Sequence, residues 1–258
     1  MHEVPVAADV VLAALLAAPA AAARVLVATP LAAYAQCGDV LVGVLAPTAV
    51  RVPGSLVGPP HVVAALRSGR ELLVGDGGVC AGDVRLTVGR WWDSTVPRVR
   101  PVPVVAVVPM PAGVPDAVSA GAGVLCEALG GGGSVPDAVR GLVGLGPGLT
   151  PAGDDLVAGV LVALMAAGDL ERAAAVLDCV RPCRHRTTAL SAALLDHAGA
   201  GRAVPQLVRY VHSPSDPAAL AGLLAVGGTS GAALALGAQI GLSVGGARMT
   251  SPADREVA

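Results

Sequence analysis

Two adjacent acids, Asp154 and Asp155, close a glycine- and proline-rich segment and directly precede an apolar run. The segment reads Gly144-Leu-Gly-Pro-Gly-Leu-Thr-Pro-Ala-Gly-Asp-Asp-Leu-Val-Ala-Gly159. Its glycines permit positive φ angles and close approach to a ligand, and Thr150 before a proline predicts a helix N-cap. Free amides at a helix start attract anions, but the two acids would repel a bare anion. The pattern favours a cation, a carboxylate-assisted reaction or a polar ligand.

The paired acids are the candidate catalytic residues of the chain. Acids at a helix start contribute only about 0.3 to 1 kcal/mol each through the helix dipole, so we expect function to explain them better than folding. The alternative is a glycine-rich turn whose acids merely stabilise the helix. We assign Asp154 and Asp155 as catalytic residues and as ligands of a possible metal, Mg²⁺. The candidate ligand-binding residues of the same segment are Gly146, Gly148, Thr150 and Gly153.

A second polar group lies on the predicted helix Thr187–Ala200. Thr187 or Thr188 shares a face of this helix with Ser191, because residues three or four apart are neighbours on its surface; we select Thr187 and Ser191 as ligand-binding residues. Arg186 stands at its start and can bind a carboxylate or a phosphate with two hydrogen bonds. The alternative is a capped surface helix with solvated arginines.

A third polar group is the turn 227–231, which contains Thr229 and Ser230. The stretch that follows Gly231 resembles the stretch that follows Gly153, with a hydroxyl and a glycine before each apolar helix. Chance similarity in a chain rich in alanine and glycine is the alternative. If this similarity reflects a true internal repeat, both turns line one pocket, and only the first turn supplies acids.

The elements that position these groups change in character along the chain. Short valine-rich runs separated by Gly, Pro and Asp predict about six to eight strands in the first half; the runs are 25–28, 40–45, 49–52, 72–74, 84–88 and 102–108, after an expected helix at 10–23. The second half predicts helices at 116–129, 136–143, 151–167, 170–180, 187–200 and 204–211, and two flanking Gly227. We predict an α+β fold, with a β-rich domain over 1–110 packed on a helical domain over 111–258.

Composition excludes several classes of function. The chain of 258 residues has a net charge of −2, so no basic face can neutralise a nucleic-acid backbone. It contains no lysine, which excludes Schiff-base chemistry and a phosphate-loop lysine. Five scattered cysteines indicate a reducing compartment. The long uncharged stretch 218–246 is interrupted by glycines, so we expect two buried helices, no membrane association and a cytoplasmic protein.

These motifs resemble a bacterial family that includes the AllH-type subunit of oxamate carbamoyltransferase. The resemblance rests on the Gly146–Gly159 motif, the Thr187–Leu195 helix and the Gly228–Gly231 turn, with weaker patterns in the strand-rich half. In that family the second turn usually carries an acid where this chain has Ala233, which leaves open any role that needs carboxylates from both turns.

The resemblance implies a subunit of a multi-component carbamoyltransferase of ureide nitrogen metabolism, with other subunits as partners. In it the two acids would orient a small carbonyl or carboxylate ligand. Two alternatives remain: a stand-alone Mg²⁺-assisted hydrolase that uses the Asp pair, and a non-catalytic ligand-binding or scaffold protein.

Overall fold

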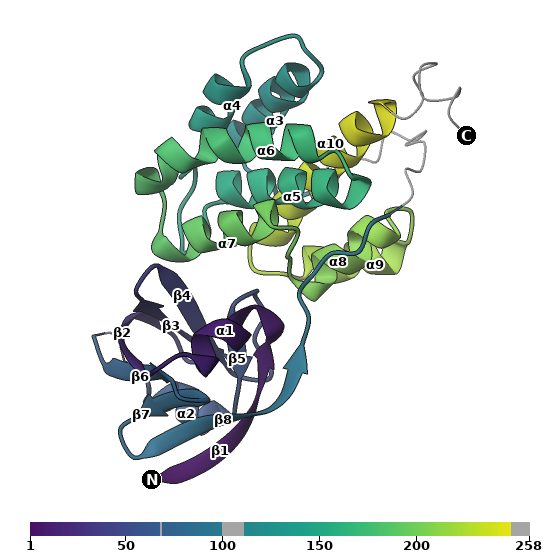
Figure 1. Cartoon of the computed structure of the whole chain (residues 1–258). Coiled ribbons are helices and arrows are strands. Elements are labelled where there is room, and N and C mark those ends of the chain that lie inside the picture. The colour runs from purple at the N-terminus through teal and green to yellow at the C-terminus, as the bar shows by residue number, and fades with distance from the viewer. Residues whose placement is uncertain (68, 100–110, 249–258) are drawn as a thin grey trace, which may run out of the picture. The chain divides into compact units, whose positions relative to one another are not determined.

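The computed structural model describes residues 1–67, 69–99 and 111–248, which form two compact units, one up to Ser94 and one from Thr95 onward (Figure 1). The strand expected at 102–108 lies outside the described residues, and so does Pro109, where the expected joint begins. The division of the chain at residue 110 therefore stays a prediction.

The first unit is a closed barrel of eight strands in the order β1-β5-β4-β3-β2-β6-β7-β8. The strands are β1 (His2–Asp9), β2 (Ala21–Ala28), β3 (Ala32–Cys37), β4 (Val40–Leu45), β5 (Ser55–Val57), β6 (Glu71–Gly75), β7 (Gly78–Ala81) and β8 (Val84–Trp92). Parallel pairing of β1 with β8 closes the barrel. Its interior is filled by small valine, alanine and leucine side chains.

Short helices and one buried acid complete the barrel. Leu12 of the 3-10 helix η1 (Val10–Leu12), Leu16 of α1 (Ala13–Ala17) and Val63 of α2 (Pro60–Ala65) join the apolar core. The fully buried Asp9 carboxylate accepts hydrogen bonds from the Ser94 hydroxyl at 2.8 Å and from the Gly54 amide at 2.9 Å. This acid therefore ties the end of β1 to the segments before β5 and after β8.

Strand predictions in this unit were partly correct. The runs at 25–28, 40–45, 72–74 and 84–88 fall in β2, β4, β6 and β8. The strand at 49–52 was wrong, and the helix at 10–23 ends at Ala17. Ala21, Ala22 and Ala23 instead pair with β6, because sheet pairing with a distant segment overrides the helix preference of alanine.

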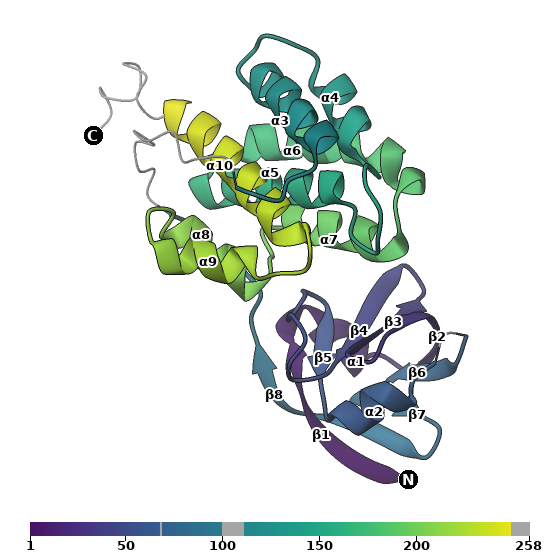
Figure 2. The same cartoon turned by 180° about the vertical axis from the view of Figure 1, so that it is seen from behind.

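The second unit is helical, as expected. Its elements are α3 (Asp116–Leu129), α4 (Val135–Leu142), α5 (Ala152–Ala167), α6 (Leu170–Val180), the 3-10 helix η2 (Arg181–Arg186), α7 (Ala189–Gly199), α8 (Pro205–His212), α9 (Pro217–Leu224) and α10 (Ser230–Arg248). Helix α5 is buried on all its faces and lies beside α10 in both views (Figures 1 and 2). A β-rich half followed by a helical half confirms the predicted α+β class.

Glycines bring α5 and α10 into close backbone contact. A Cβ at Gly159 would overlap the carbonyl oxygen of Leu234, and a Cβ at Gly237 would overlap that of Leu156. At both positions, the absence of a side chain on the glycine of one helix allows the backbone of the other helix to pack directly against it. This packing places the starts of α5 and α10 near each other, which is what the candidate site requires.

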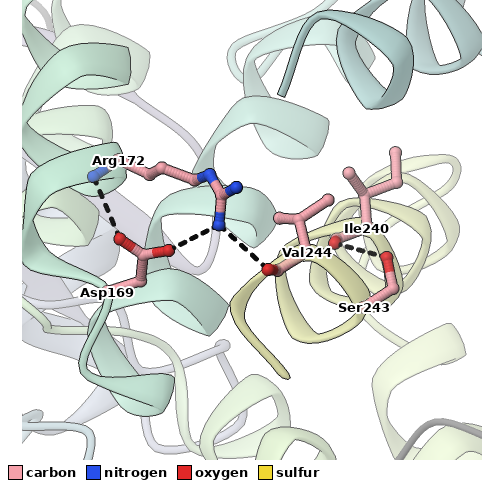
Figure 3. Close-up of polar contacts among 5 residues, drawn as sticks. All are labelled: Asp169, Arg172, Ile240, Ser243 and Val244. Carbon is pink, nitrogen blue, oxygen red and sulfur yellow. Dashed lines mark hydrogen bonds and ion pairs between the residues drawn. The ribbon is translucent and has the colours of Figure 1, made fainter. Parts of the chain in front are cut away.

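An arginine fixes the far end of α10 to α6 (Figure 3). Arg172 binds Asp169, the N-cap of α6, at 2.8 Å, and donates a second hydrogen bond to the Val244 carbonyl at 3.0 Å. In α10 itself, the Ser243 hydroxyl donates to the Ile240 carbonyl at 2.8 Å. Within the described part of the chain, no helix is both long enough and apolar enough to span a bilayer.

Candidate functional site

The loop that precedes α5 is shaped by glycines with positive φ. Gly144, Gly146 and Gly148 have φ angles of 79°, 115° and 99°, a region that other residues rarely adopt. Gly153 lies in the first turn of α5, where a Cβ would collide with the carbonyl oxygen of Leu142. Gly146 and Gly148 are exposed on the loop, whereas Gly153 is buried against the end of α4.

Thr150 is not the N-cap of α5, contrary to the sequence prediction. The helix begins at Ala152 with Pro151 as its N-cap and without a side-chain capping bond. The Thr150 hydroxyl oxygen instead lies 3.1 Å from that of Ser230, the first residue of α10. Thr150 therefore makes a polar contact between two turns and does not cap its own helix. This contact brings the predicted polar group of the glycine loop next to that of the turn 227–231.

Asp154 is a buried connector. The residue is only 1 % exposed to solvent. Oδ1 accepts a hydrogen bond from the Gly144 amide at 2.8 Å, and Oδ2 accepts one from the Ser191 hydroxyl at 2.7 Å and another from the Thr187 hydroxyl. One carboxylate thus holds the glycine loop, α5 and the start of α7, which is a larger structural role than the helix dipole alone suggested.

Thr188, which the sequence offered as an alternative to Thr187 but which was not among the predicted ligand-binding residues, completes this arrangement. Its side-chain oxygen accepts a hydrogen bond from the Ser191 amide at 3.0 Å as the N-cap of α7. Its hydroxyl donates to the Leu149 carbonyl at 2.6 Å. A threonine three residues before a serine, at the start of an Ala-Leu run, is the local signal that would have identified it as the N-cap.

Asp155 differs from its neighbour, because one of its two carboxylate oxygens is buried without a hydrogen-bond partner in the described part of the chain. The residue is 7 % exposed, and no hydrogen-bond partner among the described residues reaches its Oδ2. Burial raises the pKa of this carboxyl from 3.8 to about 7, and the charge of Asp154 adds to the rise. The hydroxyls of Ser230 and Thr150 act in the opposite direction on this pKa. Asp155 can therefore gain or lose a proton near neutral pH.

The second turn supplies hydroxyl and backbone groups but no acid. Gly227 has a φ of 61°, and the exposed Thr229 accepts the Ala233 amide through its carbonyl at 3.1 Å. Ala233 itself is fully buried in α10. The carboxylates of the site therefore come from the first turn.

Arg186 lies outside this polar cluster, although its neighbour Thr187 belongs to it. The Arg186 guanidinium donates to the Arg140 carbonyl of α4, and its own backbone carbonyl packs against Gly144. The nearby Arg184 pairs with Asp196 at 2.6 Å. The predicted anion-binding arginine therefore faces another part of the surface.

A metal centre has limited support from the geometry. Among residues 1–67, 69–99 and 111–248, no group of three or more His, Cys, Asp or Glu side chains is placed to hold a metal ion. The two oxygens of Asp154 already accept three hydrogen bonds, which leaves about one of its roughly four acceptor positions for a metal ion. The same region has no disulfide, and all five cysteines are free.

The comparisons with known proteins agree with the motifs. No solved structure matches the chain significantly. The matching family is described as oxamate carbamoyltransferase subunit AllH, and the match covers residues 142–242. This range contains the glycine loop, α5, α7 and the start of α10, whereas the weaker patterns of the strand-rich half lie outside it. The chain thus resembles the AllH subunit family of oxamate carbamoyltransferase throughout the segment that builds the candidate site.

Proposed function

We propose that this chain is a subunit of a multi-component carbamoyltransferase of ureide nitrogen metabolism that acts in the cytoplasm with other subunits as partners. The observation that carries the proposal is the meeting of three matched segments at the Asp pair. The Thr150–Ser230 contact joins the first and third segments, and the Asp154–Ser191 contact joins the first and second.

In this proposal the two acids have different roles. Asp154 is a positioning residue, because its three hydrogen bonds hold the glycine loop against α7. Asp155 is the catalytic residue, since a carboxyl with a pKa of about 7 is well suited to general acid–base catalysis at neutral pH. Thr150 and Ser230 are the hydroxyl contacts beside it, with Thr229, Gly146 and Gly148 at the exposed edge of the ligand site.

The chemistry of carbamoyl transfer to an amide needs such a group. The amide nitrogen of oxamate attacks the carbamoyl carbon, a nitrogen–carbon bond forms, and the leaving group departs with its electron pair. The amide nitrogen must then lose one proton, which Asp155 accepts. A buried base with an unmatched oxygen can bind the amide N–H directly, because a buried acceptor gains most from a new donor.

The test is to purify the tagged chain from its own host with its stable partners and to assay transfer from carbamoyl phosphate to oxamate. We expect the wild-type complex to form carbamoylated oxamate. Asp155→Asn should assemble normally and lose activity by at least about a hundredfold, the typical contribution of one general base. Asp39→Asn, at an exposed residue in the turn between β3 and β4, is the matched control. A complex without transfer activity, or an active Asp155→Asn complex, would refute the proposal.

A further inference from the structure

The helical unit contains a pocket whose lining does not include the Asp pair. It has a volume of about 540 Å³ and lies between α4, α6 and η2. Its basic lining residues are Arg140, His185 and Arg186, and Asp178 is the only acid among the described residues that line it. The lining also contains the thiols of Cys179 and Cys183.

The charges of this pocket are not balanced. Asp178 forms an ion pair with Arg181, so its charge is already compensated. Arg140 pairs with Asp137 at 2.9 Å. Arg186 donates to the Arg140 carbonyl, which holds the two arginines together, and it has no carboxylate partner in the part of the chain that the structure describes. The pocket thus keeps at least one uncompensated guanidinium.

We propose that this pocket binds a small oxyanion, a carboxylate or a phosphate, with Arg186 as its main ligand and Arg140 and His185 as additional donors. A guanidinium presents two parallel N–H groups that match either anion. The volume suits a small molecule that carries one such group. The inference rests on the pocket alone and does not require the proposed carbamoyl transfer.

Cys179 provides a direct probe, because it lines the pocket, whereas Cys126 is exposed on α3, away from the pocket lining. The full-length chain is treated with iodoacetamide at a mildly alkaline pH, and the modification of each cysteine is followed by peptide mass spectrometry. Inorganic phosphate and oxamate are added in separate arms. Sodium chloride keeps the ionic strength equal in all samples, since salt screens exposed charges.

We expect phosphate, oxamate or both to slow alkylation of Cys179 and to leave Cys126 unchanged. Protection by phosphate alone would identify a phosphate site, and protection by oxamate alone a carboxylate site. Arg186→Gln should raise the anion concentration needed for half protection by about tenfold, and Arg140→Gln should also raise it. Asp178→Asn should lower it, because the acid of the lining is removed.

Arg209→Gln is the matched control, since Arg209 lies on α8 and pairs with Asp216 at 3.2 Å, outside the pocket. In the Arg209→Gln variant, each anion should protect Cys179 at the same concentration as in the wild type. Thermal melting of each variant checks that the fold is retained. The proposal is overturned if neither anion protects Cys179, if Cys126 is protected equally, or if a folded Arg186→Gln variant behaves as the wild type.

Discussion

The hydroxyl oxygens of Thr150 and Ser230 lie 3.1 Å apart, although 80 residues separate them in the chain. One belongs to the loop before α5 and the other is the first residue of α10. Both influence the buried carboxyl of Asp155. This contact connects the two turns whose sequences resemble each other. The candidate site is therefore formed by the starts of two helices, α5 and α10, and not by one motif alone.

A first prediction concerns the energy of this contact. The single changes Thr150→Val and Ser230→Ala each remove one hydroxyl, and the double change removes the pair. We expect a coupling free energy of about 0.5 to 1.5 kcal/mol in a double-mutant cycle measured by urea unfolding. Ser243→Ala, whose hydroxyl bonds within its own helix, should show no coupling to Thr150→Val. Strict additivity of the first pair would mean that the contact contributes nothing.

Asp154→Asn should destabilise the fold. The change removes a charged acceptor of three hydrogen bonds and places an amide N–H₂ among their donors. We expect a loss of about 2 to 4 kcal/mol in the free energy of unfolding at neutral pH. The exposed Asp178→Asn should change it by less than about 0.5 kcal/mol. An Asp154→Asn protein as stable as the wild type would show that Asp154 has no connecting role.

Asp155→Asn should have the opposite effect on stability, and the effect should depend on pH. The unfolded chain ionises this carboxyl near its ordinary pKa of 3.8, whereas the folded chain keeps the proton until about pH 7. The free energy of unfolding of the wild type therefore falls as pH rises between these values, by about 1.36 kcal/mol for each pH unit and by at most about 4 kcal/mol in all. Above about pH 7 this contribution stays constant.

The asparagine variant lacks this dependence. Its stability relative to the wild type should be near zero at pH 4 and should increase to a maximum above pH 7. Urea unfolding of both proteins across pH 4 to 8 measures the difference, after correction for the common change of all other groups. Parallel curves across this range would contradict the raised pKa of Asp155.

The close approach of α5 and α10 leads to a fourth prediction. Gly237→Ala should reduce stability by about 1 to 3 kcal/mol or more, because the new methyl group would overlap the Leu156 carbonyl. Gly123→Ala is the control: this glycine lies inside α3, and nothing stands within 4 Å of its added Cβ. The control should gain about 0.5 to 1 kcal/mol from better helix propensity. Equal melting temperatures for the two variants would argue against the glycine-mediated packing.

Local patterns were sufficient for most of the helical unit. Asp116–Leu129 and Leu170–Val180 were predicted with the bounds that the structure has, because helix hydrogen bonds are local and proline, glycine and capping residues mark their ends. The strands His2–Asp9, Ala32–Cys37 and Gly78–Ala81 were not predicted. A strand is stabilised by a partner that is distant in sequence, so its own residues carry a weaker signal.

The sequence by itself determined the helices that carry the two acids, the glycine loop and several hydroxyls, since helix-start signals are local; that these residues form one site stays a prediction. Only the tertiary structure decided that the acids differ. Asp154 and Asp155 are neighbours in one helix turn, but successive side chains point in different directions. Asp154 meets donors that lie 33 and 37 residues further along the chain. The Oδ2 of Asp155 has no hydrogen-bond donor among the described residues. Burial of this carboxyl without such a donor raises its pKa to about 7.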